Sequence, residues 1–469
     1  MNNFKATIGI EIHTELNTKS KMFSSAPVSS YDEVNVNINE VDLGLPGVLP
    51  SPNKMAVIKG IQLATALGMK IDTQLCFDRK NYYYQDLSKG FQITQQYHPI
   101  GKDGKITIDG KTINIERIHL EEDTAKQQTV DGELCLDYNR CGVPLIEIVS
   151  KPDIETPQQA VAYLIAIKRI LVFLNISDGR MEDGSFRADV NISVAPIGST
   201  TLGTKVEIKN INSFANVAKA IDYEFNRQLR QILKGELIEQ ETRRWDEAKL
   251  QTVFMRLKSD AVDYHYFREP NIVEMNIENL VTTAQNEMGE LPDSVRKQLV
   301  ESGVANNIIN QLLDDYSAYK IFKYINNKLT NPGLVVTWII VELPSLLKMN
   351  NGSYDQLSND FLDRAITMLQ LLINQEINGK QAKTIFEKMY LSKKDASTLI
   401  KELGFEQIKD TSLIENYFKK YIESNKEMVD QYKERPERVE KFFIGLLMRD
   451  TKGQANPNVA IEVLKKLLH

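Results

Sequence analysis

The segment Ala6–Leu16 constrains the fold most, because its residues alternate strictly between apolar and polar. Isoleucines occupy positions 8, 10 and 12, and the opposite side holds Glu11, His13 and Glu15. A period of two predicts a β-strand with one buried face and one wet face. Carboxylates and an imidazole spaced about 6.7 Å apart along a strand suit a divalent cation or general acid–base chemistry. From this segment alone, an ordinary strand with a solvated face is an equally good interpretation.

Composition excludes several classes of protein. The chain has 469 residues, which predicts two to four domains, and 42% of them are hydrophobic, too few for a membrane protein. The longest apolar run, Leu334–Val341, is far shorter than a bilayer span, and the N-terminal residues lack the apolar core of a signal peptide. The three cysteines show no disulfide or CxxC spacing. We therefore expect a cytoplasmic protein without a membrane partner, whose net charge of −6 gives no overall indication of nucleic-acid binding.

A change in composition near residue 292 predicts the domain organisation. Before it, short strand patterns alternate with a few helices, and after it the pattern is helical almost throughout. We therefore expect an α+β fold. A β-rich mixed domain over residues 1–292 precedes an all-α helical domain over 293–404 and a small helical tail over 405–469.

Local signals predict where some elements begin and end. Ser51, Thr156 and Ser412 stand at the start of helical patterns and are the expected N-caps. Asp103 and Gly104 form a dipeptide typical of a hairpin turn. We therefore expect helices to follow the three capping residues and a short strand, residues 106–108, to follow the turn.

Three further strand patterns place charged side chains on one face. The alternating sets are Arg117, His119 and Glu121; Arg187, Asp189 and Asn191; and Lys205, Glu207 and Lys209. A turn pattern before the second set adds another acid, Glu182. Carboxylates beside lysine, arginine and histidine fit a wet groove for Mg²⁺ and phosphate, because magnesium combines a few carboxylates with phosphate oxygens.

Two features leave alternatives open. Glu147 lies among aliphatic residues, where a carboxylate needs a partner or raises its pKa. It is either a site acid or one half of a structural ion pair with an arginine such as Arg140. The cluster Tyr82–Tyr84 favours core packing over a stacking platform.

Familiar catalytic motifs are absent from the sequence. There is no GxxxxGK[ST] motif, so an ATP site would not be a P-loop. The five histidines form no HExxH motif, and no hydrolytic nucleophile with its base is recognisable. Residues 441–469 carry a basic group that predicts either contact with nucleic-acid phosphates or, equally, a solvated face. Its members are Lys441, Arg449, Lys452, Lys465 and Lys466.

A series of motifs runs along the chain in the order found in one known family. The segments are Ile8–His13, Leu45–Pro50, Phe77–Tyr82, Leu120–Asp123, Asp137–Arg140, Pro144–Val149, Met181–Asn191, Lys205–Asn210, Glu241–Arg244 and Lys452–Pro457. Together they resemble the B subunit of the aspartyl/glutamyl-tRNA amidotransferases (GatB), over nearly the whole chain.

The resemblance implies a function and partners. The family's B subunit works beside an amidase, the A subunit, which releases ammonia from glutamine, and beside a small C subunit. With ATP and Mg²⁺ it phosphorylates the side-chain carboxylate of glutamate or aspartate misacylated onto tRNA-Gln or tRNA-Asn. Ammonia arriving through an internal tunnel then displaces phosphate. The missing hydrolytic nucleophile agrees with this division of labour.

The resemblance also implies a fold and roles for residues. The β-rich domain corresponds to a "cradle", and the tail to a YqeY-like, tRNA-binding domain that contains the basic group above. The metal and phosphoryl site would comprise Glu11, His13, Glu122 and Glu147, with Glu182 and Asp189 beside it as further catalytic acids. Arg187, Lys205 and Lys209 would bind phosphate of ATP. Lys80 and Lys89 would line the ammonia tunnel or contact the nucleotide.

The sequence departs from the family pattern at several places, among them Tyr84–Asp86 and Asp183, and one departure bears on metal binding. Many members carry a CxxC zinc pair before the Leu-Pro-Gly motif, but here the stretch is Asn39–Gly44. We therefore expect no zinc. The rival function is a non-catalytic tRNA-binding scaffold for the amidase. The acidic strand faces favour the enzyme, since a scaffold for phosphate would place lysine and arginine there.

Overall fold

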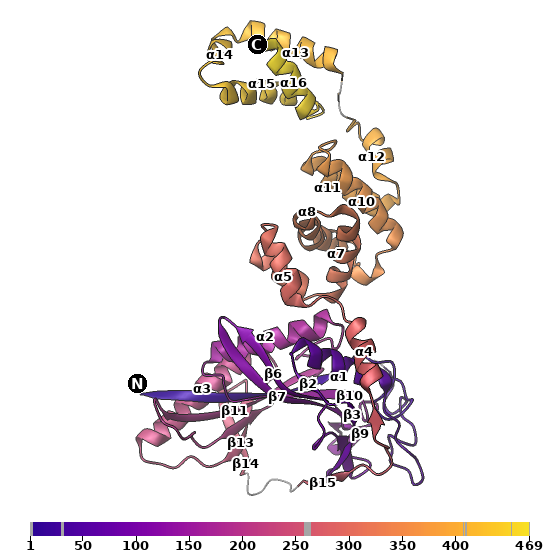
Figure 1. The fold of residues 1–469 in the computed structure, drawn as a ribbon, viewed down its shortest axis with the longest axis vertical. Helices are drawn as coiled ribbons and strands as arrows, with labels where there is room; N and C mark the ends of the chain where they lie inside the picture. The colour runs from indigo at the N-terminus through magenta and orange to yellow at the C-terminus, as the bar shows by residue number, and fades with distance from the viewer. Residues whose placement is uncertain are drawn as a thin grey trace. The chain divides into compact units, whose positions relative to one another are not determined.

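The computed structural model describes residues 3–29, 32–257, 264–406, 408, 410–451 and 453–468. The chain divides into two compact units, Met1–Val295 and Arg296–His469 (Figure 1). This division lies close to the change in composition at residue 292. The further boundary between residues 404 and 405 stays a prediction.

The first unit is built on a nine-stranded sheet with β1 at its centre. From edge to edge the strands are β14 (Gln251–Leu257), β13 (Glu241–Asp246), β12 (Val206–Lys209), β11 (Phe186–Pro196), β1 (Phe4–Glu15), β10 (Pro144–Ser150), β7 (Lys111–Glu122), β6 (Gly101–Ile108) and β2 (Lys70–Ile71). Neighbours run antiparallel except β12 and β13, which are parallel. The mixed sheet with helices agrees with the predicted α+β class.

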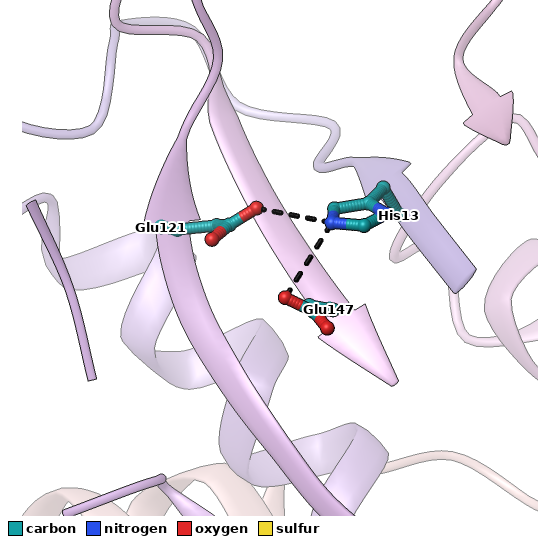
Figure 2. Close-up of side chains that lie close together, drawn as sticks. All are labelled: His13, Glu121 and Glu147. Carbon is teal, nitrogen blue, oxygen red and sulfur yellow. Dashed lines mark ion pairs between the residues drawn. The ribbon is translucent and has the colours of Figure 1, made fainter. Parts of the chain in front are cut away.

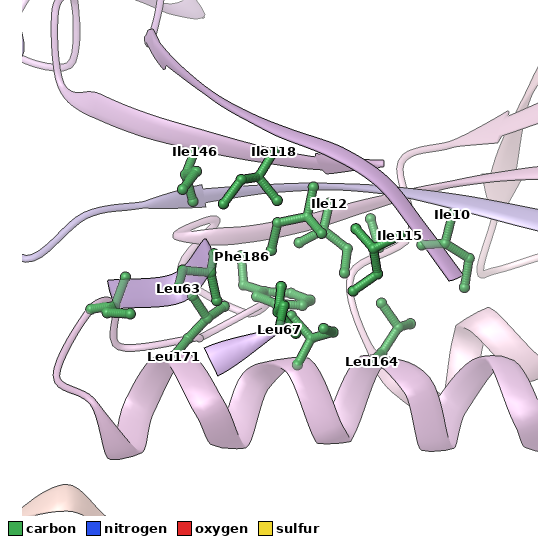
Figure 3. Packing of buried hydrophobic residues seen from close by; sticks show 14 of the residues in the cluster. Ile10, Ile12, Leu63, Leu67, Ile115, Ile118, Ile146, Leu164, Leu171 and Phe186 are labelled. Carbon is green, nitrogen blue, oxygen red and sulfur yellow. The ribbon is translucent and has the colours of Figure 1, made fainter. Parts of the chain in front are cut away.

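The hydrophobic core lies on one face of this sheet. The isoleucines of β1 at positions 8, 10 and 12 point into it and are fully buried. Three helices cover this face (Figure 1): α1 (Lys54–Ala66), α2 (Pro157–Phe173) and α3 (Phe214–Leu233). Figure 3 shows Leu164 and Leu171 of α2 facing Ile10, Ile12 and their neighbours on the strands. The alternation in Ala6–Leu16 therefore specifies this strand correctly, because the buried face selects the register.

Smaller sheets and one helix complete the first unit. They are β15 (His265–Arg268), β4 (Asp78–Asn81) and β5 (Phe91–Thr94) in one sheet; β16 (Met275–Asn276) with β3 (Gln74–Leu75); β8 (Lys126–Val130) with β9 (Glu133–Asp137); and α4 (Glu278–Asn286). The strand β5 packs against β7, which brings the three-stranded sheet beside the large one.

Two predicted N-caps are wrong and one is confirmed. Thr156 caps α2, since its side chain accepts a hydrogen bond from the backbone N–H of Gln159. Helix α1 is capped by Asn53 instead of Ser51, and α13 (Thr411–Ser424) is capped by Asp410 instead of Ser412. In both cases an amide or carboxylate oxygen close to the expected position accepts two backbone hydrogen bonds, which a predicted serine does not do.

The predicted turn at Asp103 and Gly104 is also wrong, because β6 runs through both residues. Asp103 adopts a positive φ of 55° within the strand. A Cβ atom on Gly104 would lie 2.6 Å from Cγ of Met69 and 3.1 Å from the carbonyl oxygen of Leu67. Glycine is therefore needed at this position because the strand passes too close to the end of α1 for a side chain to fit.

The second unit is helical. After α5 (Pro292–Glu301), which spans the division between the units, the elements are α6 (Asn306–Leu313), α7 (Tyr316–Leu329), α8 (Pro332–Thr337), a π-helical turn (Trp338–Glu342), α9 (Leu343–Met349), a 3₁₀ turn (Tyr354–Gln356), α10 (Asn359–Ile373), α11 (Gly379–Ser392), α12 (Ala396–Glu402), α13, α14 (Lys426–Asp430), α15 (Pro436–Asp450) and α16 (Pro457–Leu468). The last four surround a core of their own around Phe418, Phe443 and Leu464.

One helical stretch in the described part of the chain, Pro332–Met349, is long and apolar enough to cross a membrane by length and composition. The core helix of a protein in water passes the same test, and 44% of this stretch is buried inside the molecule. Val335, Val336 and Ile339 are among its buried residues. The stretch is therefore weak support for a membrane span.

Candidate active site

The face of β1 opposite the core carries Glu11, His13 and Glu15, as the alternation predicts. All three are partly buried, so the face is not simply solvated. In the sheet His13 lies opposite Glu147 of β10 and Arg187 of β11, and Glu147 lies opposite His119 of β7. Side chains from four adjacent strands therefore meet on this face.

His13, His119, Glu121 and Glu147 form a buried group that we term the acid–imidazole cluster. Nε2 of His13 lies 3.5 Å from a carboxylate oxygen of Glu121 and 3.4 Å from one of Glu147 (Figure 2). Nε2 of His119 lies 2.9 Å from the same Glu147 oxygen and 3.6 Å from the other Glu121 oxygen. Each carboxylate is thus shared by two imidazoles.

The cluster strongly perturbs the pKa of each member. Burial opposes protonation of both histidines, but the charges and hydrogen bonds of Glu147 and Glu121 together outweigh it and raise the pKa of His13 to about 8 and of His119 to about 9. Burial alone would raise the pKa of Glu147, yet His119 and His13 hold it well below its usual range. The histidines therefore supply the positive charge that lets two carboxylates stay ionised side by side.

A second group, the carboxylate–lysine cluster, lies next to it and contains Glu11, Asp189, Glu207 and Lys209. Nζ of Lys209 lies 2.5 Å from Asp189 and 3.0 Å from Glu207. Burial, Glu147 and Asp189 together raise the pKa of Glu11. Burial would lower the pKa of Lys209, but Asp189 and Glu207 raise it. The ammonium group therefore balances acids that would otherwise repel one another.

Both clusters open onto one cavity of about 310 Å³. Cationic side chains of Lys80, Lys205, Lys209 and Arg256 line it beside the acids. Nζ of Lys80 lies 4.7 Å from the ring centre of Tyr264, which also lines the cavity. Burial would lower the pKa of Lys80, but Glu121 and other neighbours raise it. A cavity walled by acids, one imidazole and fixed cations can hold a phosphate group together with a divalent cation.

Arg187 does not line this cavity and pairs with Asp123, with Nη2 2.7 Å from a carboxylate oxygen. Arg140 contacts the same oxygen at 3.6 Å and donates hydrogen bonds to the carbonyls of Thr124 and Ala125. The alternative that Arg140 pairs with Glu147 is therefore wrong. Glu147 instead takes its partners from the two histidines.

The structure separates Glu122 from the acid–imidazole cluster. Glu122 is buried and accepts hydrogen bonds from Nζ of Lys89 at 2.5 and 2.6 Å and from the backbone N–H of Ile93 at 3.0 Å. Because neighbouring strand residues point to opposite faces, Glu121 points into the cluster instead. Lys89 is thereby also removed from the cavity, whereas Lys80 lines it.

The other residues expected at the site lie further out. Glu182 is exposed in the turn before β11, and Lys205 is exposed at the rim of the cavity. Tyr83 is 95% exposed and Tyr84 is 54% exposed, so the core-packing interpretation is wrong for both. Tyr82 is half-buried and meets Tyr264 edge to face.

The basic residues of the tail lie on α15 and α16. Lys441, Arg449, Lys465 and Lys466 are exposed, while Lys452 lies outside the described residues. Arg449 pairs with its neighbour Asp450 at 2.9 Å, and Lys465 lies 3.8 Å from Glu440. Whether these side chains bind tRNA stays a prediction.

Three residues of the two clusters were missed among the expected site residues: His119, Glu121 and Glu207. The alternation of β7 and β12 did place them on polar faces. The sequence alone could not show that these faces meet the face of β1, since strand order in the sheet is a tertiary property. The structure gives one further indication that His119 belongs to the site: its buried Nδ1 atom has no hydrogen-bond partner within the described part of the chain.

Two sets of side chains fit a metal ion. The first set is His13, Glu121 and Glu147, and the second is Glu11, Asp189 and Glu207. Within each set, one donor atom per residue lies within 4.8 Å of the donor atoms of the other two. The second set is all oxygen, which suits Mg²⁺, and the first adds an imidazole. The donor chemistry therefore fits a hard divalent cation, with Glu147 and Glu11 at adjoining edges of the two sets.

The stretch expected to lack zinc is held by a buried ion pair. Nζ of Lys21 lies 3.1 Å from a carboxylate oxygen of Asp42, and Oγ of Ser24 donates to the other oxygen at 2.8 Å. Lys21 is fully buried. The carbonyl of Asp42 accepts a hydrogen bond from Ser88, the neighbour of Lys89.

Comparison with known proteins identifies the family of the chain. The GatB/GatE catalytic domain matches residues 6–283, and the GatB domain matches residues 320–468. The B subunit of the aspartyl/glutamyl-tRNA(Asn/Gln) amidotransferase of Ureaplasma urealyticum is 50% identical over the full length of both chains. The B subunits of the same enzyme from Malacoplasma penetrans and Mycoplasma genitalium are 49% and 43% identical, over this whole chain and 98% of each relative. The chain therefore belongs to the GatB family, the B subunits of the aspartyl/glutamyl-tRNA amidotransferases.

Proposed function

We propose that the chain is the kinase and transamidase component of a glutamine-dependent tRNA amidotransferase. It uses ATP to phosphorylate the side-chain carboxylate of glutamate on tRNA-Gln, or of aspartate on tRNA-Asn. The carboxylate oxygen attacks the terminal phosphorus and ADP leaves. Ammonia then attacks the acyl carbon and phosphate leaves, which forms the amide. The observation that carries this proposal is the single cavity on which both carboxylate clusters and four cationic side chains converge.

The contacts support distinct roles for the residues. His13, Glu121 and Glu147 of the first set would hold Mg²⁺, which when bound neutralises charge on the transferred phosphoryl group, and Glu11 would offer a further oxygen from the second set. Lys209 and Lys205 line the same cavity, where they would orient phosphate oxygens. Asp189 and Glu207 fix Lys209 through the short contacts described above.

Lys89 and Glu122 support a separate role in ammonia delivery. Neither residue of this buried ion pair lines the cavity. Glu122 nevertheless directly follows Glu121 on β7, and its carboxylate accepts a hydrogen bond from the backbone N–H of Ile93 on β5. This agrees with a tunnel mouth on the path of ammonia from the amidase, the A subunit. A small C subunit would complete the complex, in the cytoplasm.

The rival proposal is a non-catalytic scaffold that binds tRNA for the amidase. It gives no role to the cavity on which both carboxylate clusters and four cationic side chains converge, whereas titratable groups with shifted pKa values gather at catalytic sites. The "cradle" of the family, by contrast, would present this face of the sheet to the aminoacylated end of the tRNA.

The decisive experiment replaces His13 by alanine in the complete three-subunit complex. We expect loss of ATP-dependent phosphorylation of Glu-tRNA, measured as ADP release and trapped acyl phosphate. Glutamine hydrolysis and tRNA binding should remain. His98→Ala is the matched control, since His98 pairs with Asp72 away from the cavity. Full kinase activity in the His13→Ala complex would refute the assignment.

A further inference from the structure

A second and larger cavity, of about 720 Å³, lies at the end of β1. It is lined by Glu15 and the loop that follows it, by the start of α1, and by the segment Asn175–Asp178 after α2. Lys80, Lys209 and every possible metal ligand except Glu121 line the other cavity, and none of these residues lines this one. Its volume is in the range of small-molecule sites.

Lys59 of α1 gives this cavity a buried cation. The side chain lines the cavity although the residue is only 6% exposed. Its Nζ donates a hydrogen bond to the carbonyl oxygen of Asn175. No carboxylate in the part of the chain that the structure describes lies within ion-pair distance of it, whereas buried lysines usually have one. An ammonium group has three donors, so this one can donate further hydrogen bonds.

The desolvation of Lys59 is visible in its pKa. Burial lowers the pKa of Lys59 to about 8, and the more distant charge of Asp178 offsets only part of this effect. An anionic oxygen placed against Nζ would supply the missing counter-charge. The site is thus built to receive a carboxylate or phosphate oxygen.

The same cavity also carries negative charge. Asp178 and Glu15 both line it, and Asp178 is exposed. These acids disfavour a purely anionic ligand such as inorganic phosphate, because it would meet the carboxylates of Asp178 and Glu15 beside the buried ammonium of Lys59 and the exposed ammonium of Lys19. Burial raises the pKa of Glu15 to about 7, so Asp178 carries the larger share of the negative charge. A ligand with a carboxylate at one end and an ammonium group close by satisfies both signs of charge.

Apolar, amide and hydroxyl groups, together with the exposed Lys19, form the rest of the wall. Leu16, Val28 and Met55 supply apolar surface, and the amides of Asn17 and Asn175 lie between the charged groups. Nδ2 of Asn17 donates to Oδ1 of Asn175 at 3.3 Å, a long hydrogen bond that leaves polar atoms of both amides available. Such a lining suits a short side chain of mixed character.

We propose that this cavity binds a free, zwitterionic α-amino acid, with its carboxylate on Lys59 and its ammonium group on Asp178 and Glu15. The site is distinct from the phosphoryl-transfer cavity and does not rest on the proposed function. If both sites lie on one chain, binding of an amino acid at this cavity could regulate the activity of the phosphoryl-transfer site according to amino-acid supply.

The test measures binding of L-glutamine, L-glutamate and L-leucine to the full chain by titration calorimetry. Each amino acid is paired with its methyl ester and its N-acetyl derivative, which remove one charge each. We expect at least one amino acid to bind at millimolar or lower concentration, and both derivatives of it to bind about tenfold more weakly or not at all. Because these comparisons use the unaltered protein, they do not depend on the folding of a variant.

Lys59→Met then tests the assigned cation. We expect about a tenfold loss of affinity for the amino acid and no further loss for its methyl ester. Lys54→Met, at the exposed start of the same helix, is the matched control and should bind like the unaltered chain. The proposal is overturned if no amino acid binds, if ester and amino acid bind equally, if inorganic phosphate binds more tightly, or if both lysine variants behave alike.

Discussion

Glu147→Gln should change how the stability of the first unit depends on pH. Glu147 is the carboxylate that His13 and His119 share, with one of its oxygens 3.4 Å from Nε2 of His13 and 2.9 Å from Nε2 of His119. The substitution keeps the shape of this side chain and removes its charge. Glutamine is nearly isosteric and uncharged. Without the charge, burial dominates, so the pKa of both imidazoles should fall to or below the ordinary value of 6.5.

The size of the effect follows from the raised pKa values. A group whose pKa is higher in the folded state binds more protons there, so its stabilisation is complete below pH 6.5 and is lost as pH rises through the folded value. At about 1.4 kcal/mol per pH unit, the rise of His119 from 6.5 to about 9 corresponds to roughly 3 kcal/mol. His13, with a pKa of about 8, corresponds to roughly 2 kcal/mol. The two values do not add, because both depend on Glu147.

Urea unfolding between pH 6 and pH 9.5 measures this dependence. Trp245 lies in the first unit and Trp338 in the second, so a Trp338→Phe background reports the first unit alone. The unaltered site should lose roughly 3 kcal/mol across this range, and Glu147→Gln should lose far less. Histidine NMR follows each pKa directly. Glu116→Gln, an exposed acid of β7, is the control. Unchanged histidine pKa values in Glu147→Gln would refute the reasoning.

Three further changes test other parts of the structure. Lys89→Met should destabilise the first unit by about 3–5 kcal/mol in urea unfolding, because Glu122 then stays buried without its partner. Adding Glu122→Gln should restore much of the lost stability. A double variant as unstable as Lys89→Met would contradict this. Ile12→Ala should cost about 2–5 kcal/mol by the same measurement, since the side chain is fully buried in the core, and a loss below about 1 kcal/mol would show that the site collapses freely. Deletion of residues 406–469 should weaken tRNA binding in filter assays and spare glutamine hydrolysis; unchanged affinity for tRNA would count against the tail.

The sequence by itself determined the element at the centre of the sheet. Strict alternation in Ala6–Leu16 fixed which residues of β1 face the core, because a shift by one residue would expose three isoleucines. It also identified Thr156 as a cap and the change from a mixed to a helical chain. Ordered motifs then indicated the family, which comparison over the full length confirmed.

Only the tertiary structure decided which polar faces meet. β10 pairs with one side of β1 and also with β7, while β11 pairs with the other side of β1. All three strands are distant from β1 in sequence. This order brings His119 and Glu121 to His13, and it sends Glu122 to Lys89, one residue further along the same strand. Local patterns specify the face on which a side chain lies, but the partners across a sheet follow from long-range strand order. The pairing of Glu147 with two histidines instead of Arg140 is the clearest result of that order.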